Sequence, residues 1–147
     1  MLEYIMAKRK KDSEIHLDIT AEKRQKLESY HCAMEAGIAM IGGKYKIMII
    51  YHLMKGALRY NQIAKALPNA TPKMLSQQLK ELEFDGIITR TLYPVVPPKT
   101  EYSLTRLGEA LKPVIESLCA WSQGYYEACG IEDIHKSELP DKTNCPK

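Results

Sequence analysis

Residues 71–80 carry the sequence TPKMLSQQLK, which predicts an amphipathic helix with a well-marked start. Thr71 suits the N-cap, and Pro72 suits the first helical position, where its missing N–H is not needed. Leucines recur at i, i+4 and i+7 and predict one buried stripe. They are Leu75, Leu79 and Leu82. Gly86 follows the predicted helix, 71–84, as a C-terminal stop does.

The face opposite the leucines is polar and rich in hydrogen-bond donors. It consists of Lys73, Ser76, Gln77 and Lys80. The lysines and the glutamine are long enough to reach base edges or phosphates. The acids of this segment lie in residues 81–85. This distribution fits a helix whose first two turns enter the major groove of a duplex. A solvated face on a purely structural helix is the alternative.

The positive charge is concentrated in the middle of the chain. Residues 36–80 carry seven Lys or Arg and no Asp or Glu, although the whole 147-residue chain has a net charge of only +3. The seven are Lys44, Lys46, Lys55, Arg59, Lys65, Lys73 and Lys80. Concentrated positive charge beside a donor-rich helix predicts contact with a polyanion, and with nucleic acid in particular.

The elements around this helix predict a helix-turn-helix with a wing. Asn61 is expected to cap a helix over residues 62–67, and residues 68–70, PNA, form the turn into the next helix. Two β-like runs follow, 87–93 and 99–104, and a proline-rich segment joins them into a hairpin. Further candidate phosphate contacts are Arg90, Lys99 and Lys112. Arg59 and Thr71 complete the set of candidate DNA-contacting residues.

The N-terminal part predicts helices with less distinct boundaries. Asp18 or Thr20 can cap a helix that runs through residues 21–28 towards Met40, with Ser29 as a second candidate start. Residues 44–54 are too apolar for periodicity to separate a helix from a strand, but their length and the flanking glycines favour a helix. Residues 57–60 are expected to form a short extended piece.

A heptad seam follows the second β-like run. Thr105 can cap a final long helix, which Pro113 should kink or divide. Its apolar positions step by four and three residues over three heptads. They are Leu107, Leu111, Val114, Leu118, Trp121, Tyr125 and Ala128. Packing against the chain's own core is one interpretation, and we favour a dimer interface that includes Leu111, Leu118, Trp121 and Tyr125. A dimer would place its two copies of the 71–84 helix about 34 Å apart, one helical turn of duplex DNA.

Composition excludes several classes of protein. Apolar content is 45%, no run approaches the ~20 apolar residues of a membrane span, and the first residues do not form a signal peptide. We therefore expect a cytoplasmic protein with a flexible basic tail at 1–19, one domain at 20–129 and a loose tail at 130–147. Its four cysteines match no zinc template, and we expect no metal or cofactor. No catalytic motif is present, so an enzyme is not expected.

Cys32 follows His31 just before the apolar part of the first predicted helix. A thiol near a helix start or a cationic neighbour can react with oxidants or electrophiles. An inert small residue in a helix is the simpler interpretation, and spacing alone favours it.

Several segments, in order and at fitting distances, resemble the HxlR family of bacterial and archaeal transcription regulators, winged-helix proteins related to the MarR group. The resemblance runs from Cys32 to about Trp121. Its segments are Gly42-Gly43-Lys44, Arg59-Tyr60-Asn61-Gln62-Ile63, residues 74–83 (MLSQQLKELE), Asp85-Gly86, residues 93–99 (YPVVPPK), residues 101–105 (EYSLT) and Gly108. The chain departs from the family pattern at Ala33, Tyr45, Tyr60 and Ala70.

This resemblance implies a homodimer built on the first and last helices, with the Thr71 helix in the major groove and the wing over the minor groove. It also makes Cys32 a candidate sensor of oxidants, quinones or aldehydes. We therefore expect a mainly α fold with a small β-hairpin, a winged helix-turn-helix, that regulates transcription by binding specific double-stranded DNA. The alternative is a winged-helix module that binds protein and not DNA. A thiol-dependent reductase acting through Cys32 is a more distant one.

Overall fold

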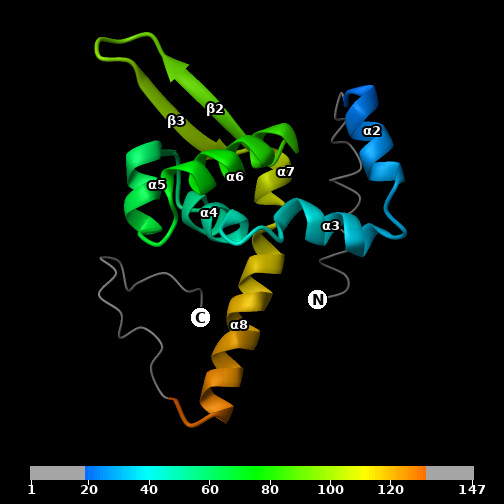
Figure 1. Ribbon diagram of the computed structural model, residues 1–147. Helices are drawn as coiled ribbons and strands as arrows, with labels where there is room; N and C mark the ends of the chain where they lie inside the picture. Colours follow the sequence, from blue (N-terminus) through cyan, green and yellow to red (C-terminus); the bar gives the residue numbers. More distant parts are fainter. Residues whose placement is uncertain (1–18, 132–147) are drawn as a thin grey trace. The chain divides into compact units, whose positions relative to one another are not determined.

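The computed structural model describes residues 19–131 (Figure 1). The chain divides after Ala110 into two compact units. The predicted tails at 1–19 and 130–147 lie outside the described residues, apart from residues 19, 130 and 131.

The first unit combines short helices with a small antiparallel sheet. The helices are α2 (Ala21–Glu28), α3 (Ala33–Ile41), α4 (Lys46–Leu53), α5 (Tyr60–Ala66), α6 (Pro72–Phe84) and α7 (Arg106–Glu109). The strands are β1 (Leu58–Arg59), β2 (Ile88–Tyr93) and β3 (Lys99–Leu104). The strand order is β1-β3-β2, so the predicted hairpin gains a third, two-residue strand. The β2–β3 hairpin projects beyond the helices of this unit (Figure 1).

The core of the first unit joins α4, α5 and α6 to the start of β2. Its most deeply buried side chains are Ile49, Ile50, Ile63, Leu75, Leu79, Leu82 and Ile88. The three leucines predicted to form the buried stripe of α6 are among them. Each fully buried aliphatic side chain contributes about 1.5–3 kcal/mol of transfer free energy. This burial fixes which face of α6 points outward.

The predicted helix from residue 21 towards Met40 is two helices. Thr20 caps α2, as predicted, through its Oγ1, which accepts from the Lys23 N–H at 3.3 Å. The hydroxyl of Ser29 then donates to the Lys26 carbonyl at 2.6 Å and closes the last turn. A new helix begins after Cys32, not after Ser29. Sequence periodicity could not locate this break, because helix-forming residues lie on both sides of it.

Two further helix starts differ from the prediction. Helix α5 begins at Tyr60, so Arg59 and not Asn61 is its N-cap. The pairing of Arg59 with Glu101 keeps Arg59 extended, and the Gln62 side chain accepts from the Arg59 N–H at 2.8 Å. Thr105 caps the short helix α7 and not the long one. Within α7, a Cβ at Gly108 would collide with the Ile87 carbonyl, so glycine lets α7 approach the start of β2.

In its described residues, 111–131, the second unit forms one long helix, α8 (Lys112–Ala128). Pro113 lies in its first turn, where a missing N–H is tolerated. The proline therefore marks a division of the predicted helix, as the sequence indicated. The apolar seam continues along α8, and Trp121 is 66% exposed.

Candidate nucleic-acid interface

Helix α6 presents the predicted polar face to solvent. Thr71 Oγ1 accepts from the Met74 N–H at 3.2 Å and caps the helix, with Pro72 in the first turn. The cap and the buried leucines together fix the start and the rotation of α6. The predicted contacts on this helix are Thr71, Lys73, Gln77 and Lys80, which are exposed, and Ser76, which is half-buried.

Tyr45 stabilises the turn between α5 and α6. This tyrosine is buried, and its hydroxyl donates to the Asn69 carbonyl at 2.9 Å. Its backbone N–H donates to Oε1 of Gln78 on α6 at 2.9 Å. One residue thus ties the start of α4 to both the turn and helix α6. In the sequence Tyr45 stands out only as a departure from the family pattern, and no pattern predicts a role for Gln78.

Lys46 is withdrawn from the cationic surface that the charge count predicted. Its side chain is only 7% exposed, and its Nζ lies 2.7 Å from Oε2 of Glu81. The other carboxylate oxygen of Glu81 accepts from Nε2 of Gln77 at 2.9 Å. Hydrogen bonds from Lys46 first and Gln77 second lower the pKa of Glu81 below its usual value. The carboxylate therefore stays ionised at neutral pH.

Helix α2 neutralises the acidic end of α6. Nζ of the buried Lys23 donates to the Phe84 carbonyl at 2.9 Å and lies 5.6 Å from the centre of the Phe84 ring. A cation at a helix C-terminus is favoured by the helix dipole. Burial raises the pKa of Asp85, while Lys23 and Lys26 act in the opposite direction. No sequence pattern predicts this contact, because Lys23 lies 61 residues from Phe84.

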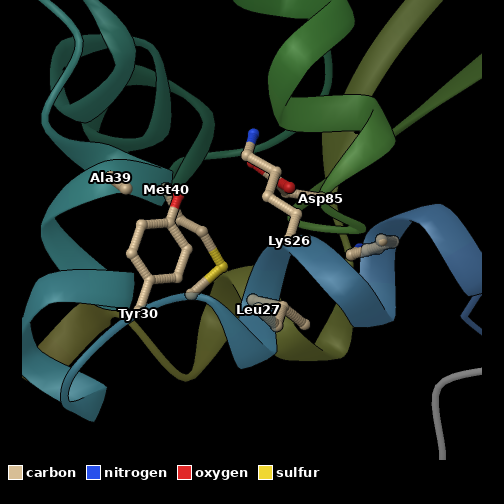
Figure 2. A pocket seen from close by; sticks show the side chains of 7 residues that line it. Lys26, Leu27, Tyr30, Ala39, Met40 and Asp85 are labelled. Carbon is tan, nitrogen blue, oxygen red and sulfur yellow. The ribbon is translucent and has the colours of Figure 1, made fainter.

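A small hollow lies between α2, α3 and the end of α6. Figure 2 shows its lining, which comprises Lys23, Lys26, Leu27, Tyr30, Ala39, Met40 and Asp85. The charged groups of this lining belong to the lysine contacts with the end of α6. At this hollow, α2 and α3 pack near the C-terminal end of α6.

The two basic residues of the wing differ in their surroundings. Arg90 on β2 is exposed and stands opposite Tyr102 of β3. Lys99 is already paired, since its Nζ lies 2.8 Å from a Glu101 oxygen and 5.3 Å from the centre of the Tyr93 ring. Hydrogen bonding from Lys99 holds the pKa of Glu101 below its usual value. Arg90 is thus the freer of the two for a phosphate contact.

Arg59 is exposed at the start of α5 and pairs in register with Glu101. Lys112 lies in the second unit, where its Nζ is 3.7 Å from a Glu116 oxygen. An exposed pair of this kind stabilises a helix by only about 0.3–0.5 kcal/mol, so Lys112 is readily released.

Cys32 is exposed at the N-terminus of α3. Its Sγ accepts from the Glu35 N–H at 3.5 Å, and the Glu35 carboxylate accepts from the His31 N–H at 2.7 Å. The thiol is therefore the cap of α3, and a change at sulfur acts directly on the first turn of this helix. The sequence predicted Cys32 inside one continuous helix, whereas it is the N-cap of a separate helix, α3.

Exposed apolar side chains follow one face of α3 and of α8. On α3 these are Met34 and Ile38, the latter 61% exposed. On α8 they include Leu118, Trp121 and Tyr125, and the last two rings stack with centres 5.6 Å apart. Leu111, also predicted for a dimer interface, is half-buried just before α8.

Among residues 19–131, no group of three or more metal-ligating side chains gathers into a site. None of the helices in the same part of the chain is long and apolar enough to cross a membrane.

The comparisons with known proteins agree with one another. A family model described as HxlR-like helix-turn-helix matches residues 40–129. The uncharacterized HTH-type transcriptional regulator YkvN of Bacillus subtilis strain 168 is 46% identical over 100 residues, which cover 68% of this chain and 84% of YkvN. The uncharacterized HTH-type transcriptional regulator YdeP of the same organism is 47% identical over 108 residues, covering 73% of this chain and 84% of YdeP.

Solved structures of regulatory proteins are also similar. The redox regulator HypR in its reduced form has a TM-score of 0.64 and 38% identity, covering 67% of this chain and 98% of that one. The reduced form of the transcriptional regulator YodB from B. subtilis has a TM-score of 0.60 and 35% identity, covering 67% and 98%.

Fold, site and relatives together define a winged helix-turn-helix transcriptional regulator, and not an enzyme. The chain belongs to the HxlR-like helix-turn-helix family.

Proposed function

We propose that this regulator binds specific double-stranded DNA as a homodimer, with α6 in the major groove and the β2–β3 wing along the neighbouring backbone. The observation that carries the proposal is the exposed, donor-rich face of α6, opposite its three buried leucines. Residues 20–129 form the proposed functional domain. Because a DNA-binding regulator must be located with the DNA that it binds, we propose the cytoplasm as its location.

The side chains of this face divide into two proposed roles. Lys73 and Lys80 are point charges suited to phosphates, while Gln77 carries both a donor and an acceptor suited to a base edge. Arg90, Lys99 and Arg59 are proposed to contact the backbone beside the groove. Ser76 and Thr71 add hydroxyl groups near the start of the helix.

Alanine variants of α6 test this proposal. We expect Gln77→Ala to weaken binding to a selected duplex about 5- to 150-fold, the contribution of one bidentate base contact. Lys73→Ala should weaken binding to all sequences and lower the log–log salt slope by about 0.9, because one phosphate is no longer neutralised. Fluorescence anisotropy at two or more salt concentrations measures both effects.

Arg24→Ala is the matched control, because it removes one positive charge from an exposed position on α2. It should bind as the parent does. All variants should retain nearly the parent melting temperature. The rival function, a module that binds protein and not DNA, predicts that no duplex is retained and that salt has little effect.

We also propose that Cys32 senses oxidants or electrophiles. The thiol is exposed and caps α3, and two structural relatives of this chain, HypR and YodB, are a named redox regulator and a regulator solved in its reduced form. Oxidation or alkylation of Sγ would change the acceptor that holds the first turn of α3. Helix α3 carries one of the exposed apolar faces proposed for the dimer interface. A change in its first turn would therefore alter that interface.

The substitution Cys32→Ser tests sensing without removing the cap, since a serine hydroxyl is a strong N-cap acceptor. We expect unchanged DNA affinity for the reduced protein and loss of the release caused by hydrogen peroxide or a quinone. Cys129→Ser, which alters another exposed thiol, should still release DNA on treatment. Release that survives in Cys32→Ser would exclude this thiol as the sensor.

A further inference from the structure

The side-chain amide of Gln77 is held in place by a chain of contacts that begins in the core. Its Nε2 donates to Oε1 of Glu81 at 2.9 Å, one helical turn along α6. The other oxygen of Glu81 lies 2.7 Å from Nζ of Lys46, whose side chain is 7% exposed. Lys46 belongs to α4, behind the reading helix. A buried ammonium group thus fixes a carboxylate, and the carboxylate fixes the amide.

The negative charge of Glu81 determines which end of the Gln77 amide faces the Glu81 carboxylate. An ionised carboxylate only accepts hydrogen bonds, so it attracts the NH₂ group of Gln77 and repels the carbonyl oxygen. Glu81 is ionised at neutral pH, and the hydrogen bond from Lys46 lowers its pKa further. Nε2 carries two hydrogens, and Glu81 takes one of them. The second N–H and the carbonyl oxygen of Gln77 have no other partner among the described residues.

The remaining donor and acceptor match one base better than the others. In the major groove adenine presents an N6 donor beside an N7 acceptor, and a glutamine amide can satisfy both. Guanine presents two acceptors, O6 and N7, which would leave the oxygen of Gln77 facing another acceptor. We infer that Gln77 reads an adenine, and that Glu81 and Lys46 are positioning residues that set the direction of its amide. This inference depends on the proposed binding of DNA by α6.

The substitution Glu81→Gln should reverse the amide of Gln77. Lysine only donates, so the new side chain must turn its oxygen towards Lys46. Its NH₂ group then faces Gln77, which has to present its own oxygen in return. Both hydrogens of Gln77 Nε2 would point outward, and the pattern of two donors fits the two acceptors of guanine. The preferred base should change from adenine to guanine.

Selection from a random duplex pool by the full chain, followed by sequencing, tests the inference. Gln77→Ala identifies the position that Gln77 contacts, because preference there disappears. We expect that position to be adenine for the parent, and guanine for Glu81→Gln. The preference for adenine over guanine should change by about 5- to 150-fold, measured by anisotropy on the paired duplexes. An unchanged adenine preference in Glu81→Gln, or a pair other than A·T at that position, would overturn the inference.

Controls separate base preference from charge and from folding. Glu83→Gln makes the same charge change at an exposed position of α6 that does not touch Gln77, so it should strengthen binding without altering the preferred base. If Glu81→Gln unfolds because the buried Lys46 loses its oppositely charged partner, the double variant Lys46→Met with Glu81→Gln replaces it. Without the lysine the new amide has no fixed direction, so adenine preference should disappear without a gain for guanine. Retained adenine preference in the folded double variant would contradict the inference.

Failure of the proposed function gives a different result. If α6 does not bind DNA, Gln77→Ala binds as the parent does, and no position depends on Gln77. If α6 binds DNA but the amide is not set by Glu81, preference at one position disappears in Gln77→Ala, while Glu81→Gln keeps the parent preference.

Discussion

Among the described residues, His52 has a half-buried imidazole whose protonation opposes folding. Its Nε2 is buried and has no hydrogen-bond partner in the described part of the chain. The ring stands edge-on to Tyr51, with centres 5.4 Å apart. Burial lowers the pKa of His52 below 6.5, and the positive charge of Lys55 lowers it further. The imidazole is therefore neutral in the folded protein at neutral pH.

This lowered pKa predicts a loss of stability in mild acid. The unfolded chain takes up a proton near pH 6.5, whereas the folded chain does so only at lower pH. Between the two pKa values the unfolded state binds more protons, so the free energy of unfolding falls as the pH falls, by at most about 1.4 kcal/mol per pH unit. Urea unfolding at pH 7.5 and pH 5.5 measures the loss.

The variant His52→Phe should have a smaller difference between the two pH values, because it cannot take up the proton. Glu81, with a pKa held below 4.5, does not titrate in this range and leaves the comparison undisturbed. An equal loss of stability in His52→Phe and in the parent would show that another group is responsible.

At the scale of the element, the N-cap of α6 can be tested directly, and it sets where this helix begins. Thr71→Ala removes the acceptor of the Met74 N–H and should lower the free energy of unfolding by about 1 kcal/mol. Thr71→Ser keeps a hydroxyl at the same place and should retain most of the stability. Chemical denaturation of both variants measures the difference. If the two variants prove equally stable, the cap does not hold the helix.

Helix α6 also shows which features of the fold sequence patterns can predict. Threonine, proline and the leucine spacing are local signals, and they placed its start, its buried stripe and its exposed face. The break at residues 29–32 and the Arg59 cap were not predictable in this way. The first depends on the thiol of Cys32 acting as a cap, and the second depends on a strand pairing with Glu101.

The candidate site was only partly predictable for the same reason. The three lysines Lys46, Lys73 and Lys80 are indistinguishable in a count of charges. Only the packing of α4 against α6 buries the first of them and joins it to Glu81. Likewise, the contact of Lys23 with the end of α6 joins residues 61 positions apart. Pairings between distant elements leave no periodic trace in the sequence.

At the scale of the whole molecule, the homodimer is the proposal with the widest consequences. The exposed apolar side chains of α3 and α8 would otherwise remain in water, where burial is worth about 25 cal/mol per Å² of apolar surface. Placing a charge there, as in Trp121→Glu or Ile38→Glu, should convert the dimer into a monomer and weaken DNA binding. Analytical ultracentrifugation measures the mass, which should fall from twice 16.8 kDa to 16.8 kDa.

Gln123→Glu adds the same charge to α8 at a polar, exposed position, and it should remain dimeric. A parent protein that sediments as a single chain at micromolar concentration would contradict the proposal. So would a Trp121→Glu variant that keeps the parent mass.

The burial of Lys46 behind α6 bears on any attempt to transplant specificity. A graft of residues 71–85 onto another winged scaffold would carry Gln77 and Glu81 but leave their ammonium anchor behind. Such a chimera should inherit the general attraction to phosphates and lose the choice of base. To transfer the base preference as well, an engineer would have to transplant Lys46 together with residues 71–85.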